Sequence, residues 1–357
     1  MFTPSRLTIA RERRRLSKKA LAQAVGVTPH TVLRYESGVI QPPVEAVERL
    51  ATALEFPLDF FFQPDVDGPG VDGASFRSMS AMSAKERDAA LAAGKLAFIV
   101  SDWVMDKFDL PVPDLIDLTG DSPEIAARSL REKWGLGERP IKNMAHLLEA
   151  KGVRLFSMAE DTMAVDAFSV WRDTTPYVFL NTMKSAEHSR FDAAHELGHL
   201  VLHKHGGPHG RAAEDQANFF ASSFLMPESD VRATMPRVHT LNQVVEAKKR
   251  WAVSAMALIH RLHRLQIMGD WQYRSFCIDA TDLGYRRQEP FPIGREYSVV
   301  WQKVLTTLWN ERVTKETVAK ELFIPVEELE NLLFGLAGAP AEAGDWADRP
   351  PLRLVSD

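Results

Sequence analysis

The sequence predicts a mainly α-helical α+β fold with one small β-sheet, and three observations support this prediction. Apolar residues recur at helical spacing over most of the chain, including the first 62 residues and the segment 241–267. Between Val153 and Asn181 the pattern changes to short stretches rich in Val, Phe and Tyr, which are typical of strands. The chain of 357 residues exceeds one typical domain, and the Gly-, Pro- and Asp-rich segment 64–75 has the composition of a flexible linker.

The N-terminal segment predicts a module of five short helices. Ser17 is expected to cap a helix at Lys18–Val25, and Gly26 suits the tight turn that follows it. Thr28 is expected to cap the next helix, and the Pro pair at 42–43 to begin another.

Charge is distributed unevenly along the chain. The net charge is −5, yet eight Lys and Arg residues oppose one acidic residue, Glu12, between Met1 and Arg34. A basic N-terminal segment on an acidic remainder indicates that this end of the chain meets phosphate. Because the chain has a single cysteine, Cys277, no apolar secretory segment and no stretch of ~18 apolar residues, we expect a cytoplasmic protein that does not enter a membrane.

The segment from Leu16 to Pro43 reads LSKKALAQAVGVTPHTVLRYESGVIQPP. It strongly resembles the helix-turn-helix of phage-repressor-like regulators, the XRE family (Cro/C1 type), and the resemblance extends over residues 7–62. It implies that the helix after the turn lies in the major groove of DNA. The side chains expected at bases or phosphates are Lys18, Thr28, His30, Thr31 and Arg34. Lys18 stands where the family often has Gln, so we expect it at a phosphate. A module used for protein contacts alone is the alternative, which the basic cluster disfavours.

The middle of the chain predicts a small sheet followed by two helices. A turn is expected at 174–176, a long helix from about Ser189, and another helix at Arg211–Leu225. The expected strands are Val153–Met158, Val165–Trp171 and Tyr177–Asn181.

Residues 195–199 read HELGH, which matches the HExxH pattern. On a helix, His195 and His199 lie on one face and can bind one Zn²⁺ through ring nitrogens. Glu196 is rotated by about 100° from His195, which suits it to act as general base toward a metal-bound water.

A third ligand is required, and two patterns offer one. Glu214, on the following helix, would complete a His₂Glu set that leaves one position open for water. His205 approximates the metzincin spacing, but Leu202 stands where that pattern requires Gly. His203 is poorly placed, since a straight helix puts it ~12 Å from His195. We favour Glu214.

The stretches RFDAAHELGHLVLH and EDQANFFASSFLMP closely resemble the ImmA/IrrE family of metallopeptidases, over about residues 164–227. The resemblance implies a zincin-like, gluzincin-type peptidase domain with His195, His199 and Glu214 as metal ligands and Glu196 as catalytic base. Gln216 replaces a common Glu without removing a ligand. Family members cleave helix-turn-helix repressors in response to stress. Which residue would stabilise the oxyanion stays open among His203, His205, His209 and Tyr177.

The C-terminal third predicts further helices. The segment Leu241–Met268 is expected to form two helices broken near residues 252–253, with Ser254 as cap. Arg261 and Arg264 on the second of these helices indicate either a nucleic-acid contact or packing and substrate docking. A strand at Tyr273–Ile278 and helices at 296–311 and 315–336 are expected to follow. Residues 313–333 have another helix-turn-helix rhythm around Pro325, and its second helix, which carries three Glu residues and no basic residue, is interpreted as a protein-contact element.

Together these predictions give four segments. They are a helix-turn-helix domain (1–63), a linker (64–75), a zinc peptidase domain with a helical preface (76–270) and a helical C-terminal region with a loose tail (271–357). The predicted function is a stress-responsive regulator that binds a double-stranded DNA operator, forms a homodimer and cleaves a repressor-like protein or its own linker. The metal is expected to be Zn²⁺, with Mn²⁺ or Co²⁺ also able to bind such a set. The alternative is a non-proteolytic transcription factor or antitoxin in which the zincin fold acts as a sensor or partner-binding domain.

Overall fold

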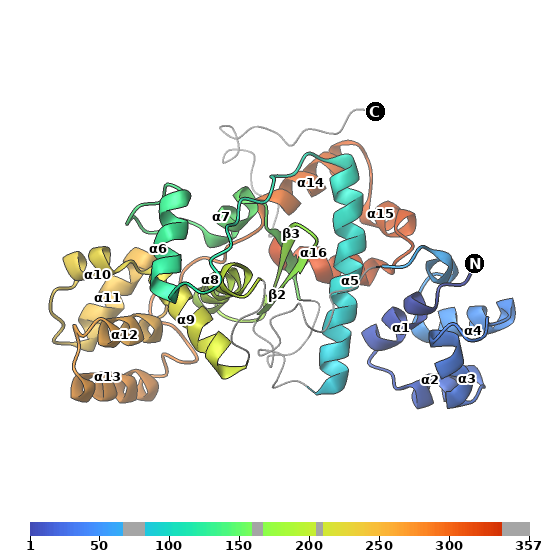
Figure 1. Cartoon of the computed structure of the whole chain (residues 1–357), viewed down its shortest axis with the longest axis horizontal. Helices are drawn as coiled ribbons and strands as arrows, with labels where there is room; N and C mark the ends of the chain where they lie inside the picture. The colour runs from blue at the N-terminus through green and yellow to red at the C-terminus, as the bar shows by residue number, and fades with distance from the viewer. Residues whose placement is uncertain (67–82, 159–166, 205–209, 338–357) are drawn as a thin grey trace.

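A computed structural model describes residues 1–66, 83–158, 167–204 and 210–337. This part of the chain is mainly helical with one three-stranded sheet, which confirms the predicted α+β class. The molecule is elongated, with the N-terminal helices at one end and the lobe formed by α10 (Glu228–Thr234) to α13 (Asp270–Asp282) at the other (Figure 1). No helix in the described ranges has both the length and the apolar character needed to cross a bilayer.

The N-terminal domain contains four α-helices and one 3₁₀-helix, where the sequence predicted five short helices. Ser17 and Thr28 cap their helices as predicted, since their hydroxyls accept hydrogen bonds from the backbone N–H groups of Ala20 and Thr31, both at 3.1 Å. Gly26 adopts φ +71°, which permits the tight turn between the second and third helices. The elements are α1 (Pro4–Arg13), α2 (Lys18–Val25), α3 (Pro29–Glu36), α4 (Val44–Leu54) and η1 (Leu58–Phe62).

The long helix α5 (Ala84–Lys107) lies between the N-terminal domain and the sheet (Figure 1). It begins at a capping box, in which Ser83 and Glu86 bind each other's backbone N–H groups. Small residues allow the sheet to approach closely: the Cβ position of Gly94 lies 3.7 Å from the ring of Phe179. One apolar cluster therefore runs from the N-terminal helices through α5 to the sheet.

The sheet has the strand order β1-β3-β2, with β1 parallel and β2 antiparallel to the central strand β3. The turn between β2 and β3 consists of Asp173 and Thr174, because Arg172 already pairs with Thr175. The turn predicted at 174–176 was thus placed too late, and Asp173 takes the left-handed conformation that the tight turn needs, at φ +53°. The strands are β1 (Arg154–Ser157), β2 (Ala167–Arg172) and β3 (Thr175–Leu180).

The side chains of β3 alternate between the two faces of the sheet and belong to two separate apolar clusters. Tyr177 and Phe179 belong to the cluster that includes α5, whereas Val178 and Leu180 belong to the cluster that includes α8 (Ala186–Leu202). The helix α8 begins three residues earlier than predicted, because the Ser185 hydroxyl accepts a hydrogen bond from the N–H of His188 at 3.2 Å. The HExxH motif thus lies on a helix that packs directly against the sheet.

Most helices after α8 follow the prediction, with one clear error. The break near residues 252–253 is confirmed, with Ser254 capping the second helix. The strand predicted at Tyr273–Ile278 is wrong: these residues lie within α13, where the buried pair Phe276 and Ala280 has helical i, i+4 spacing. The remaining helices before α13 are α6 (Pro123–Lys133), α7 (Met144–Ala150), α9 (Arg211–Leu225), α11 (Leu241–Trp251) and α12 (Ala255–Arg264).

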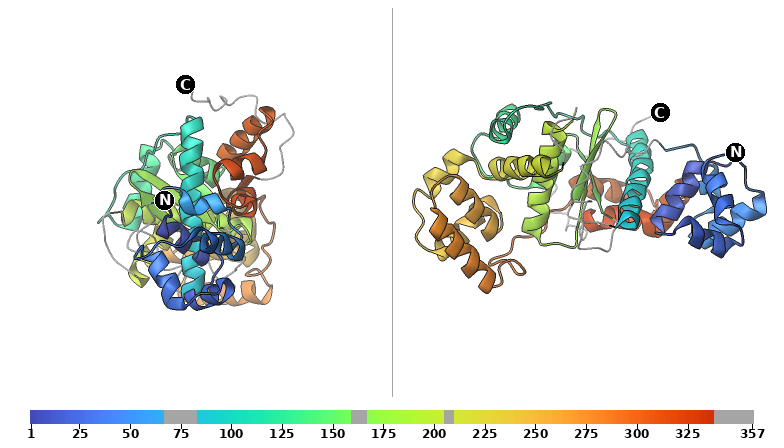
Figure 2. Two further views of the ribbon diagram at one scale, coloured as in Figure 1. Left: turned by 90° about the vertical axis from the view of Figure 1, so that its right-hand side faces the viewer. Right: turned by 60° about the horizontal axis from the view of Figure 1, so that its bottom comes forward.

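The last three helices return to the N-terminal end of the molecule. The helix α16 (Val326–Ala337) packs on β1 and α5, and Figure 2 shows α14 to α16 beside α5 and the N-terminal helices. Glu328 of α16, buried at 1% exposure, accepts hydrogen bonds from Arg13 (2.6 Å), the last residue of α1, and from Arg14 (2.8 Å), which follows it. The other two are α14 (Val299–Asn310) and α15 (Lys315–Glu321). The predicted domain boundaries stay a prediction, and residues 67–75 of the predicted linker lie outside the described ranges.

Candidate metal centre and DNA interface

Helices α8 and α9 bring together the three side chains predicted as metal ligands. The Nε2 atoms of His195 and His199 lie 3.0 Å apart, and each lies 3.3 Å from one carboxylate oxygen of Glu214. Among the described residues, these three side chains form a group whose ligand atoms lie close enough together to hold a metal ion. Gly198 permits the close helix pairing, because a Cβ at this position would lie 3.0 Å from the ring of Phe220.

The geometry of these three side chains fits a divalent transition metal. Tetrahedral coordination with bonds of about 2.0–2.1 Å separates neighbouring ligand atoms by roughly 3.3 Å. Burial favours the neutral form of Glu214, but its hydrogen bonds with His195 and His199 hold its pKa below the usual range, so the carboxylate is ionised. Two imidazoles and one carboxylate can hold Zn²⁺ or Mn²⁺ and leave a position for water.

Neighbouring side chains orient both imidazoles. Asn218, one turn after Glu214 on α9, places its Oδ1 3.0 Å from Nδ1 of His195, which leaves Nε2 directed at the cluster. His203 Nδ1 lies 2.9 Å from Nδ1 of His199, and its Nε2 lies 3.0 Å from Oε1 of Gln216. Burial lowers the pKa of His203, so a neutral ring can accept from His199 and donate to Gln216.

Glu196 is buried beside the cluster at 2% exposure. Its Oε2 accepts a hydrogen bond of 2.6 Å from the hydroxyl of Ser169 on β2. Burial disfavours the charged form of His195, but its contact with Glu214 and the charge of Glu196 raise the pKa of His195 above the usual value. The carboxylate of Glu196 is thus held by β2 and acts electrostatically on the imidazole of His195.

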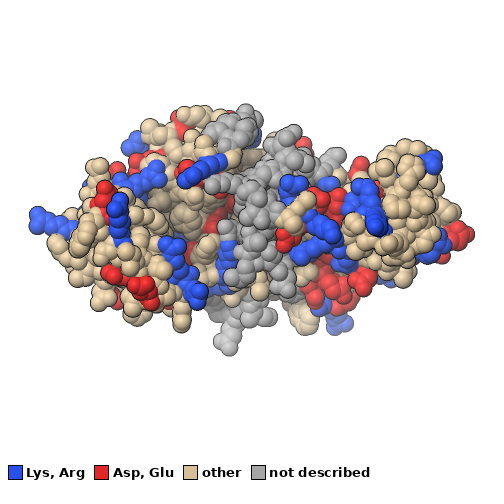
Figure 3. Space-filling view, turned by 90° about the horizontal axis from the view of Figure 1, so that it is seen from below, with Lys and Arg blue, Asp and Glu red and all other residues tan. Residues whose placement is uncertain are grey.

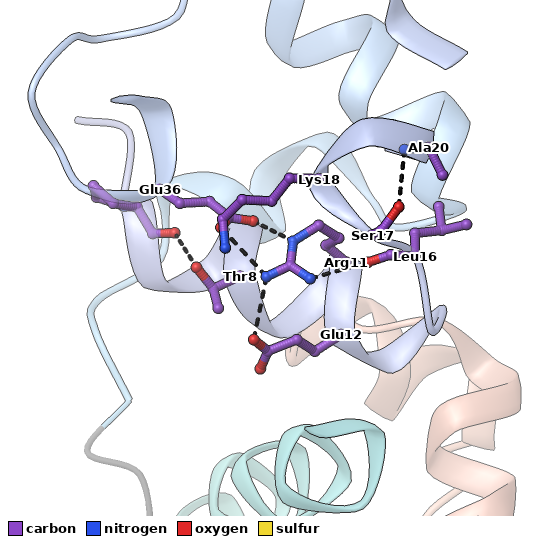
Figure 4. A network of polar contacts seen from close by, with 9 residues as sticks. Thr8, Arg11, Glu12, Leu16, Ser17, Lys18, Ala20 and Glu36 are labelled. Atoms are coloured by element: carbon purple, nitrogen blue, oxygen red, sulfur yellow. Dashed lines mark hydrogen bonds and ion pairs between the residues drawn. The ribbon is translucent and has the colours of Figure 1, made fainter. Parts of the chain in front are cut away.

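The predicted DNA-contacting residues lie on α2 and α3. Thr28, His30 and Arg34 are exposed and Thr31 is partly exposed, with the Thr28 and Thr31 hydroxyls 2.8 Å apart. Lys18 is partly exposed, and its Nζ lies 3.2 Å from Oε2 of Glu36 (Figure 4), so its contact with a phosphate stays a prediction.

Two family models match the parts of the chain that carry these residues. Residues 5–59 match the model of a helix-turn-helix domain, and residues 148–263 match the model of a peptidase family described as the IrrE N-terminal-like domain. The chain joins a helix-turn-helix domain to an IrrE N-terminal-like domain. A comparison with curated proteins found no match. The chain is therefore a regulator with a DNA-binding domain and a protease-like domain, as the resemblances implied.

The basic cluster of the helix-turn-helix domain is less available to DNA than its sequence suggested. Arg6, Arg11 and Arg13 are buried, and their side chains bind Pro64, Glu36 and Glu328 inside the protein. Arg14 also binds Glu328. The guanidinium of Arg11 bridges α1 to the end of α3 (Figure 4). Half of the eight basic side chains thus stabilise the fold, and Arg34 is the exposed cation on α3.

Tyr177 of the IrrE N-terminal-like domain was one of four candidates for stabilising the oxyanion, and the structure excludes it. Tyr177 is fully buried on the α5 side of the sheet, where its hydroxyl lies 3.0 Å from that of Ser101. It therefore points away from the cluster on α8. His203 instead orients His199, and His205 and His209 lie outside the described ranges.

Two residues of the centre were missed, although the sequence contains a signal for one. Asn218 follows Glu214 by four residues, and this spacing places both on one face of a helix. Ser169 had no such signal, because its contact with Glu196 joins a strand to a helix 27 residues later.

Replacing Asn218 by Ala is expected to weaken metal binding by about 10–100-fold, the usual cost of losing the partner that orients a ligating imidazole. Titration with a competing chelator measures this change. Ser222→Ala, one turn further along α9, is the matched control and should bind metal as the wild type does. Equal affinity of the Asn218→Ala variant and the wild type would show that the hydrogen bond to His195 does not hold the ring.

Proposed function

We propose that the chain binds a DNA operator and is a metal-dependent endopeptidase that cleaves a repressor-like protein or its own segment at 64–75. The observation that carries this proposal is the meeting of His195, His199 and Glu214 beside the buried carboxylate of Glu196. A site that only stabilised the fold would not need Glu196. The operator would be read by α3, and we expect a homodimer because such domains usually bind two half-sites.

The residues around the cluster fit the steps of peptide hydrolysis. A bound Zn²⁺ or Mn²⁺ would supply Lewis acidity, lowering the pKa of a water and polarising the scissile carbonyl. Glu196 would accept the proton of that water and donate it to the leaving amine. Ser169, which donates to one carboxylate oxygen, would keep Glu196 in the orientation for both transfers.

The sheet offers a place for an extended substrate. Among the described residues β2 pairs with β3 on one side, so its other side is an edge. An extended peptide can add to such an edge through main-chain hydrogen bonds. Since β2 carries Ser169, a peptide bound there would pass close to Glu196.

Mapping of new protein N-termini in host cells that carry the wild type or Glu196→Gln, with and without DNA damage, tests this function. We expect a cut that depends on Glu196 in a repressor-like protein or at 64–75, with cleavage by the variant slower by about 10²–10⁴-fold. Metal content of the purified variant should equal that of the wild type. Glu246→Gln, an exposed change on α11, is the matched control and should cut normally.

If no cut depends on Glu196, the peptidase assignment fails. Operator binding with normal regulation by the Glu196→Gln variant would then identify a non-proteolytic transcription factor.

A further inference from the structure

A cleft of about 1660 Å³ opens beside the metal cluster. One wall is formed by α8 and α9, and the other by α12, the start of α13 and residues 285–289. We call it the basic cleft. It exceeds the ~300–1,000 Å³ of ordinary small-molecule sites, so its size suits a segment of polypeptide.

The basic cleft is continuous with the metal cluster. Phe191, one helical turn before His195, and Asn218, which contacts His195, both line it. The residues of α8 that line the cleft extend back to Glu187, eight residues before His195. At 1.5 Å per residue this distance is about 12 Å, enough for three or four residues of extended peptide at ~3.3 Å each.

The accessible charge of the basic cleft is positive. Arg264, Arg286 and Arg287 line it and are exposed. The guanidinium of Arg264 lies 3.4 Å from the ring centroid of Phe219, and Arg286 donates to the Thr281 hydroxyl at 3.1 Å. Figure 3 shows Lys and Arg side chains, with Asp and Glu side chains among them, over the left-hand part of this face, where α12 and α13 lie. Such charge is unexpected in a chain of net charge −5.

Each acidic residue of the same walls has a basic partner, and two of the three are largely buried. Glu187 and Glu289 lie 3.4 and 3.1 Å from Nζ of Lys248, and both are largely buried. Asp270 lies 2.8 Å from Nε2 of His263. The three exposed arginines therefore outnumber the one exposed carboxylate, that of Asp270, among the charges that a ligand would meet.

We propose that the basic cleft binds an acidic segment of the protein substrate, three or more residues from the bond that is cut. This inference rests on the proposed function, because it assigns the substrate of the same metal centre. Carboxylates of the segment would pair with Arg264, Arg286 and Arg287, and its apolar side chains would contact Phe191 and Met256, which also line the cleft. Charge complementarity of this kind selects the partner and accelerates its association.

The test measures binding without cleavage, in the full chain carrying Glu196→Gln and loaded with Zn²⁺. The probe is a fluorescein-labelled octapeptide with four Asp or Glu residues, compared with its Asn and Gln counterpart by fluorescence anisotropy. Adding Arg286→Glu and Arg287→Glu should weaken binding of the acidic peptide about tenfold, or roughly 1.4 kcal/mol. The matched control is the double reversal Arg128→Glu and Lys142→Glu, at exposed positions outside the cleft, which should leave the affinity unchanged.

Equal binding of the two peptides, or equal losses in the cleft and control variants, would overturn the inference. So would tighter binding of a single-stranded oligothymidine at the same arginines, which would identify a nucleic-acid site. Because no cutting is measured, failure of the proposed peptidase activity would leave this result unchanged, and the two proposals can fail separately.

Discussion

Replacing Lys248 by Met is expected to lower the free energy of unfolding by about 3–5 kcal/mol, the usual cost of removing one partner from a buried ion pair. Lys248 is fully buried on α11, and its ammonium group lies between the carboxylates of Glu187 and Glu289. It also donates to the carbonyl oxygen of Phe291 at 3.3 Å. Met has a similar shape but no charge, so two carboxylates would be left buried and facing each other.

Chemical denaturation of the purified full chain measures this loss. The matched control is Lys249→Met on the same helix, whose partner Glu246 is exposed, and it should cost at most about 1 kcal/mol. The loss of unfolding free energy in Lys248→Met should be smaller at pH 5. At that pH the carboxylates of Glu187 and Glu289, left without the ammonium group, can take up a proton and lose the buried charge. A loss below about 1 kcal/mol at pH 7.5 would contradict the role given to Lys248.

The buried ion pairs also have a consequence for the site. Glu187 lies on α8, two turns before His195, and it accepts a hydrogen bond from the N–H of Ile293 at 2.9 Å. Glu289 accepts from the N–H of Ala255 at the start of α12. Lys248 therefore connects the metal-binding helix with both parts of the opposite wall of the basic cleft, so its loss should disturb the cleft as well as the fold.

Local signals in the sequence predicted the features that depend on neighbouring residues. The hydroxyls of the caps Ser17, Thr28 and Ser254 each accept a hydrogen bond from the backbone N–H group three residues later. His195 and His199 are four residues apart on one helix, so their shared face followed from helical geometry alone. Glu214 was favoured because it completes a known His₂Glu set, but its distance from both histidines depends on the packing of α8 against α9, which no local pattern reports.

Features that depend on distant residues could not be predicted. Arg13 and Glu328 are 315 residues apart, so nothing near Arg13 indicated that its charge would be turned inward. Tyr177 faces α5 because alternation along β3 fixes its side, but the sequence did not say which side meets α8. The Tyr273–Ile278 error arose because a short apolar run fits a strand or a helix, and packing of Phe276 and Ala280 decided for the helix.

The ligand set can be tested most directly at Glu214. Replacing it by Ala is expected to weaken metal binding by more than the ~10–100-fold that loss of an orienting partner costs, because two imidazoles alone would remain. The fold should persist, since the side chain of Glu214 pairs with His195 and His199 inside the cluster and not with the apolar core. Metal content after gel filtration and competition with a chelator give the change in affinity, and peptide cleavage should disappear with the metal.

The neighbouring residue Asp215 supplies a matched control. Its side chain is 68% exposed and lies 3.9 Å from Arg211, away from the cluster, so Asp215→Ala should keep both metal and activity. If the Glu214→Ala variant retained one tightly bound ion, the third ligand would have to come from elsewhere, and His205 would be the next residue to replace. If Glu214→Ala lost the ion and Asp215→Ala kept it, the His₂Glu set would be established. Both variants remove one carboxylate from the same helix, at neighbouring positions.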